Sequence, residues 1–211
     1  MGPPPGRAGA GRGARGGAAA AAGPAAAAAG AGAGPGPGPG PGSAGLPALS
    51  APVYSLVTRC EAGGGAAGPW ALNLVTYASP VALRPRRAYA LGLFEGTLSR
   101  ENLLRERRGL LQVLREEHAG LTDLLGRQSS RDVDKLAAAE AAGHAVRGDA
   151  LGGFPALAGA AAWLEVAVTD GPFDRGDHAV VLLDVLAECP GAEPGGGPVL
   201  YSGKLRELGI L

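Results

Sequence analysis

The chain has 211 residues and a formal net charge of zero, with 19 basic and 19 acidic side chains. This balance argues against nucleic-acid binding through phosphate neutralisation, and two cysteines, Cys60 and Cys189, are too few for a disulfide-rich scaffold or a cysteine-based zinc site. No stretch of the sequence combines the length and the apolar content of a membrane-spanning helix.

Residues 1–50 differ sharply in composition from the rest of the chain. They contain 16 Gly, 17 Ala and 9 Pro, with three Arg and no acid, so they carry +3 while residues 51–211 carry −3. So few large side chains cannot offset the entropy cost of ordering the backbone, and we expect a disordered tail. The tail is compatible with a transit peptide to a chloroplast or mitochondrion, and a low-complexity extension of a cytoplasmic protein is the alternative.

Strands dominate the pattern predicted for residues 51–211, which are long enough for one domain with a substantial core. Runs rich in β-branched and aromatic residues, bounded by Gly, Pro or Asp, predict these strands. In chain order they cover residues 52–60, 70–77, 88–94, 110–114, 162–169, 178–186 and 198–202. The first two are expected to form a hairpin, and the fifth and sixth to form another across a loop of about eight residues.

Three short helices are predicted among the strands. Ser99 is the expected N-cap of the first, the second covers 116–125, and the third covers 132–142. Strands with a few interspersed short helices indicate an α+β domain, mainly antiparallel, built on a sheet or barrel. A doubly wound parallel sheet is disfavoured because the helices do not alternate regularly with the strands.

Three small polar side chains, Asn73, Thr76 and Ser79, mark the end of the second predicted strand at a spacing of three. Pro80 follows them, so we expect the chain to bend and regular strand pairing to end before it. The three groups could then gather around one edge of a ligand, such as a heteroaromatic ring with carbonyls and ring nitrogens, which requires both donors and acceptors. Ordinary side-chain bonding at a strand end is the alternative.

A second polar cluster, Gly96-Thr-Leu-Ser-Arg-Glu-Asn102, stands at the start of the first predicted helix. Free backbone N–H groups at a helix start attract an anion. Hydroxyls from Thr97 and Ser99 and a positive charge from the arginines between Arg84 and Arg100 would complete a phosphate seat. A simple N-cap is the alternative.

The three histidines, His118, His144 and His178, are too scattered in the sequence to form a local metal signature. Each is better explained as a surface residue or as a hydrogen-bonding partner in a turn. His178 stands at a strand start, where its imidazole could bond Asp177 or Asp174.

These polar clusters give the sequence a resemblance to the flavin reductase-like, FMN-binding split-barrel family. The resemblance covers most of residues 52–211. It rests on the N-x-x-T-x-x-S-P strand end, the apolar strand after it, the Gly-Thr-Leu-Ser-x-x-Asn helix start and the Gly176-Asp-His178 turn. It implies a split β-barrel that binds FMN, with FAD as the alternative flavin.

The resemblance also implies a set of cofactor-binding residues, because in such proteins the early strand end faces the flavin ring and the helix start holds the ribityl-phosphate end. These residues are Asn73, Thr76, Ala78, Ser79, Thr97, Ser99 and Asn102. Lys135 and His178 are weaker candidates.

The activity that the resemblance implies is hydride transfer from NADH or NADPH to the flavin or another acceptor. The cofactors carry that chemistry, so no side chain need act as an acid or base. The resemblance further implies a homodimer with each flavin near the subunit interface. A non-catalytic flavin-binding or interaction module on the same barrel is the alternative.

Overall fold

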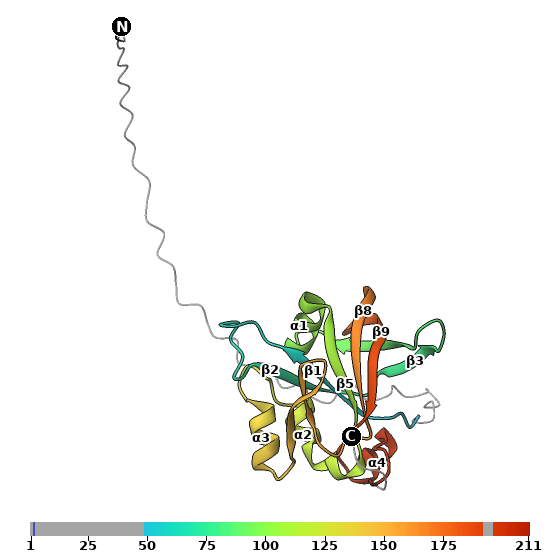
Figure 1. Ribbon diagram of the computed structural model, residues 1–211. Coiled ribbons are helices and arrows are strands. Elements are labelled where there is room, and N and C mark those ends of the chain that lie inside the picture. The colour runs from blue at the N-terminus through green and yellow to red at the C-terminus, as the bar shows by residue number, and fades with distance from the viewer. Residues whose placement is uncertain (1, 3–48, 192–195) are drawn as a thin grey trace, which may run out of the picture. The chain divides into compact units, whose positions relative to one another are not determined.

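The computed structural model describes residues 2, 49–191 and 196–211 (Figure 1). The disordered tail expected over residues 1–50 therefore lies outside the described residues, apart from positions 2, 49 and 50. Within the described ranges, no helix is both long enough and apolar enough to cross a membrane.

A seven-stranded antiparallel sheet forms the framework of the described chain, with the strand order β2-β1-β5-β8-β9-β4-β3. Its strands are β1 (Tyr54–Arg59), β2 (Trp70–Val75), β3 (Ala78–Ala82), β4 (Ala88–Phe94), β5 (Arg108–Val113), β8 (Ala162–Arg175) and β9 (His178–Pro190). A separate two-stranded sheet pairs β6 (Val146–Leu151) with β7 (Phe154–Leu157). The expected α+β, mainly antiparallel architecture is confirmed.

The seven-stranded sheet must curl, because its two edge strands are neighbours in the chain. Only Thr76 and Tyr77 separate β2 from β3. The three residue steps from Val75 to Ala78 span at most about 11 Å, whereas a flat seven-stranded sheet would hold its edges about 29 Å apart. The sheet therefore closes toward a barrel that stays split along a seam between β2 and β3.

Alternating side chains divide the apolar residues between two cores. Leu56 of β1 and Leu111 of β5 pack with residues from β4, β8 and β9 inside the curled sheet. Their neighbours Val57 and Leu110 point the other way, into a second core beneath the helices. A period of two along each strand accounts for this division.

Five short helical segments complete the described chain: α1 (Leu98–Glu106), a 3-10 helix η1 (Glu116–Leu121), α2 (Thr122–Gly126), α3 (Lys135–Ala141) and α4 (Ser202–Glu207). Leu103 of α1 packs into the barrel interior. In contrast, α2, α3 and α4 contribute to the outer core, and Figure 1 shows them at the opposite end of the domain from α1.

Two predictions about the helices are wrong. The N-cap of the first helix is Thr97 rather than Ser99, since the Thr97 hydroxyl accepts a hydrogen bond from the Arg100 N–H at 3.3 Å. The helix expected over 116–125 is divided at Leu121 into η1 and α2. The Thr122 hydroxyl donates to the carbonyl of Ala119 at this junction, which competes with regular helical bonding.

The expectation that strand pairing ends before Pro80 is also wrong. β3 pairs with β4 through this position, with Pro80 opposite Tyr89. Proline lacks a donor, but β3 is an edge strand and needs a bonding partner on only one side.

The eight-residue loop expected between residues 170 and 177 is mostly paired strand. β8 continues to Arg175 and β9 begins at His178, which leaves Gly176 and Asp177 as the turn. The Gly-Pro dipeptide, which favoured a loop in the sequence, is accommodated within β8 by register shifts between Val168 and Phe173. The strand expected over 198–202 is reduced to two isolated bridges before α4.

His118 is buried, although its imidazole is a turn partner as expected. Its Nδ1 accepts from the Arg115 N–H at 3.2 Å, and its Nε2 lies 3.2 Å from the Ala158 carbonyl oxygen. Burial lowers the pKa of His118, with the neighbouring His144 acting in the same direction and Glu117 in the opposite one. The neutral ring that donates from Nε2 satisfies both contacts.

We therefore expect the fold to lose stability as the pH falls. A folded-state pKa below the usual His value of about 6.5 means that the unfolded chain binds the proton more tightly. The stabilisation is full above about pH 6.5 and is lost as the pH falls through the folded-state pKa. Melting temperatures between pH 7.5 and 5 would measure this slope, which His118→Asn should flatten.

Candidate functional site

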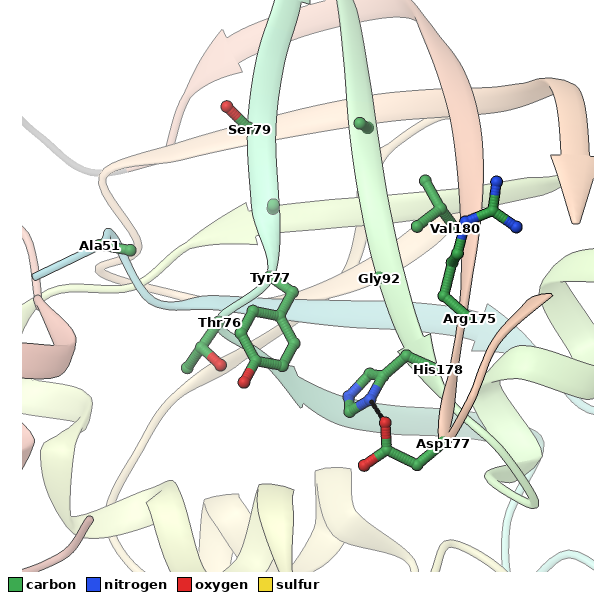
Figure 2. A pocket seen from close by; sticks show the side chains of 11 residues that line it. Ala51, Thr76, Tyr77, Ser79, Gly92, Arg175, Asp177, His178 and Val180 are labelled. Carbon is green, nitrogen blue, oxygen red and sulfur yellow. Dashed lines mark hydrogen bonds and ion pairs between the residues drawn. The ribbon is translucent and has the colours of Figure 1, made fainter. Parts of the chain in front are cut away.

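Two hollows lie near the seam of the barrel. Hollow A, of about 590 Å³, is lined by the segment 76–79, by Ala90 and Gly92 of β4, by residues of the β8–β9 turn and by Ala51 and Val180 (Figure 2). Hollow B, of about 220 Å³, is lined by Leu72 and Asn73 of β2, the segment 94–99 and the loop 126–130. Phe94 of hollow B contacts His178 of hollow A, with ring centroids 5.3 Å apart.

The structure brings six of the seven residues in the predicted site to these hollows. Thr76, Ala78 and Ser79 line hollow A. Asn73, Thr97 and Ser99 line hollow B.

Asn102 lines neither hollow. It is 0% exposed, and its amide nitrogen lies 3.4 Å from the Thr58 hydroxyl and 3.5 Å from the Cys60 sulfur. Burial raises the pKa of the Cys60 thiol, while its contact with Asn102 acts in the opposite direction. The side chain of Asn102 thus ties α1 to the end of β1.

The start of α1 presents backbone donors to hollow B. The first N–H groups of a helix have no acceptor within it, and those of Leu98 and Ser99 are the first two of α1. The Thr97 hydroxyl is already committed to the fold, because it caps the helix and donates to the Phe94 carbonyl at 3.0 Å. An anion at this position would therefore meet the backbone N–H groups of Leu98 and Ser99 rather than the Thr97 hydroxyl.

The arginines expected to supply positive charge do not line hollow B. Arg87 pairs with Glu188 at 2.5 Å, and Arg100 lies 3.5 Å from Asp174. The arginine that lines the hollow is Arg127, in the loop after α2, and its guanidinium lies 3.6 Å from an Asp123 carboxylate oxygen and donates to the Ile210 carbonyl at 3.4 Å. Sequence reasoning missed this residue because the loop reaches β2 only through the tertiary fold.

The loop 126–130 is fixed at both ends. The Ser130 hydroxyl accepts from the Leu72 N–H at 3.2 Å and lies 3.3 Å from the Leu72 carbonyl oxygen, so it takes the place of a strand neighbour on the edge of β2. The buried Lys135 amine donates to the Leu125 carbonyl at 2.9 Å. Burial lowers the pKa of Lys135 to about 8, and its amine points into the fold rather than into hollow B.

His178, a weaker candidate from the sequence, lines hollow A beside Asp177. Its Nδ1 lies 2.8 Å from an Asp177 carboxylate oxygen, and this hydrogen bond lowers the pKa of Asp177 (Figure 2). The turn that carries both residues is fixed to the end of β4, because the Glu95 N–H donates to the Asp177 carbonyl at 3.0 Å. Arg175 adds a positive charge to the same wall.

Tyr77 is a lining residue of hollow A that sequence reasoning overlooked. Its ring and that of His178 point toward one another (Figure 2), with centroids 5.0 Å apart and planes at 81°. One feature of the sequence indicates where Tyr77 lies, namely the glycine at position 92 in an otherwise apolar strand. Such a glycine often marks a close approach of another backbone.

The chain was also compared with known protein families and with curated proteins. The sequence profile of a family described as the flavin reductase like domain matches residues 46–209. A search of curated proteins gave no match.

Several solved structures share the fold. The styrene monooxygenase flavin reductase of Pseudomonas putida S12 aligns with a TM-score of 0.56 and 20% identity over 72% of this chain and 86% of its own. An NADH:FAD oxidoreductase of Streptomyces globisporus C-1027 aligns with a TM-score of 0.59 and 17% identity over 74% and 83%. An FMN-binding protein from Thermus thermophilus with bound p-hydroxybenzaldehyde aligns with a TM-score of 0.54 and 21% identity over 69% and 77%.

Proposed function

Because this chain belongs to the flavin reductase like family, we propose that it is an oxidoreductase that binds FMN and passes hydride from NADH or NADPH to flavin or another acceptor. The observation that carries the proposal is the pair of contiguous hollows. One is wide and partly apolar, and the other combines a helix start with Arg127. This pair matches a molecule with a flat ring at one end and a phosphate at the other.

The residues present fit such a molecule. A hollow of about 590 Å³ lies within the usual range for small-molecule sites. Thr76 and Ser79 offer hydroxyl donors and acceptors to the polar edge of a ring, and Ala78 leaves room beside them. Asn73, Arg127 and the N–H groups at the start of α1 would hold the phosphate.

Flavin, when bound, supplies the hydride and electron chemistry of the reaction. The part of this chain is to bind, to orient and to exclude water. Arg175 and His178 stand on the wall of hollow A and are available to an anionic nicotinamide nucleotide. Asp177 fixes the imidazole by its hydrogen bond, so its orientation is set before any ligand arrives.

We expect purified protein mixed with FMN to retain the flavin and to show a yellow colour after desalting. Anaerobic addition of NADH or NADPH should then bleach the visible flavin band. A yellow protein that neither nucleotide bleaches would point to the non-catalytic flavin-binding module. A protein that retains neither FMN nor FAD would exclude the proposal.

A homodimer is the second part of the proposal. Val81 and Leu83, at and just beyond the end of the β3 edge, and Leu186 of β9 are apolar side chains left exposed, and they offer a surface for a second copy. Sedimentation of the flavin-loaded protein should give the mass of two chains, and the mass of one chain would contradict this assignment.

A further inference from the structure

We propose that Tyr77 is a flavin-contacting residue, and that its phenol ring forms a wall of hollow A against which the bound flavin ring packs. The inference rests on the proposed function. It adds a residue outside the strand-end positions 73, 76, 78 and 79 and assigns to it a contact of a particular chemical kind.

The ring of Tyr77 is exposed at a position where the fold gains little from an aromatic side chain. It is 65% exposed, and it stands at the seam between β2 and β3, on the rim of hollow A. Aromatic rings stabilise proteins mainly through the large area they bury. A ring left this open beside a hollow has most of that area available to a ligand.

The position of Tyr77 is nevertheless fixed. Its carbonyl accepts from the Gly92 N–H at 2.7 Å. A Cβ atom at residue 92 would come within 2.9 Å of the Tyr77 Cβ, so glycine at this position is what allows β4 to approach so closely. The backbone of Tyr77 is therefore held by its neighbour before a ligand binds.

The ring also belongs to a row of three aromatic side chains that joins the two hollows. It stands edge-on to His178, which in turn stands edge-on to Phe94 at 76°. Besides its contacts with these two rings, His178 is held by its hydrogen bond to Asp177. A ligand that extends from hollow A toward hollow B would pass along this row, with Tyr77 at the end that lies in hollow A.

Tyr77 is the only tyrosine or tryptophan among the described residues that line either hollow. This gives the proposal a spectroscopic signature. A phenol in contact with a photoexcited flavin passes one electron to the ring, and the electron then returns, so the emission is quenched and nothing is consumed. A phenyl ring of the same shape is much harder to oxidise and does not quench in this way.

The test compares wild-type protein with Tyr77→Phe, Tyr77→Ala and a matched control, Tyr201→Phe. Tyr201 is also a partly exposed tyrosine, at 44%, and it lines neither hollow. FMN affinity is measured by calorimetry, and the emission of bound FMN is measured at saturation. Wild type and Tyr201→Phe should quench bound FMN strongly.

Tyr77→Phe should keep the FMN affinity within about twofold, because the packing area remains, while the emission of bound FMN rises several-fold. Tyr77→Ala should show the same rise and lose about tenfold in affinity. Bound FMN that is quenched equally in wild type and Tyr77→Phe would overturn the proposal and leave flavin binding intact. Failure of the wild type to bind FMN would instead overturn the proposed function.

Discussion

Replacing Ser129 by glutamate is expected to weaken FMN binding by about 100-fold. Ser129 is partly exposed and lines hollow B, so the substitution brings a carboxylate to the proposed phosphate seat. Two like charges about 6 Å apart at an effective dielectric constant of about 20 repel by roughly 2–3 kcal/mol, which corresponds to that loss of affinity.

Ser129→Gln is the matched control, because it has the same size without the charge. Both variants lose the bond that the Ser129 hydroxyl accepts from the Arg131 N–H at 3.1 Å. The glutamine variant should bind FMN within about threefold of wild type, because the loss of one exposed hydrogen bond changes the affinity by no more than that. Riboflavin, which lacks the phosphate, should bind both variants alike. Equal FMN affinities in calorimetry would show that the phosphate seat lies elsewhere.

Replacing Asn102 by alanine is expected to lower the free energy of unfolding by about 2–4 kcal/mol, because it removes a fully buried side chain and its contacts. The substitution leaves the Thr58 hydroxyl and the Cys60 sulfur without the amide that joins them to α1. Urea titration would measure the loss. Where the variant is still folded, its FMN affinity should stay within about threefold of wild type, since Asn102 lines neither hollow.

Asn73→Ala is the companion measurement and should show the opposite pattern. Asn73 is only partly buried and lines hollow B, so its loss should cost less than about 1 kcal/mol of stability and weaken FMN binding about fivefold. An Asn102→Ala variant that kept its stability but lost FMN would restore the direct ligand role that the resemblance implied. Our placement of that residue would then be wrong.

The sequence was a good guide where local pattern and tertiary structure agree. The apolar run over 88–94 predicts β4 with its bounds. One face of the strand is buried in the barrel, and the small residues Ala90 and Gly92 of the other face line hollow A. The prediction that strand pairing ends before Pro80 was wrong for a physical reason. The rule that proline ends strand pairing assumes a partner on each side, and an edge strand has only one.

The site was predictable only in part. Thr76 and Ser79 fall close together in the chain, so their shared hollow follows from local spacing. Arg127 lies about 50 residues from β2 in sequence, and it reaches hollow B because the Ser130 hydroxyl bonds the Leu72 peptide. No local pattern encodes that contact. The N-cap preference likewise did not distinguish Thr97 from Ser99, which are both good caps.

The seam between β2 and β3 has a consequence for how the barrel opens. The two strands are not hydrogen-bonded neighbours in the described sheet, so they can separate without breaking a bond of the ladder. Edge strands of this kind fray first and exchange their amide protons soonest. A ligand that occupies both hollows would touch Asn73 on one edge and Ser79 on the other, and would hold together two edges that the chain itself joins at a single point.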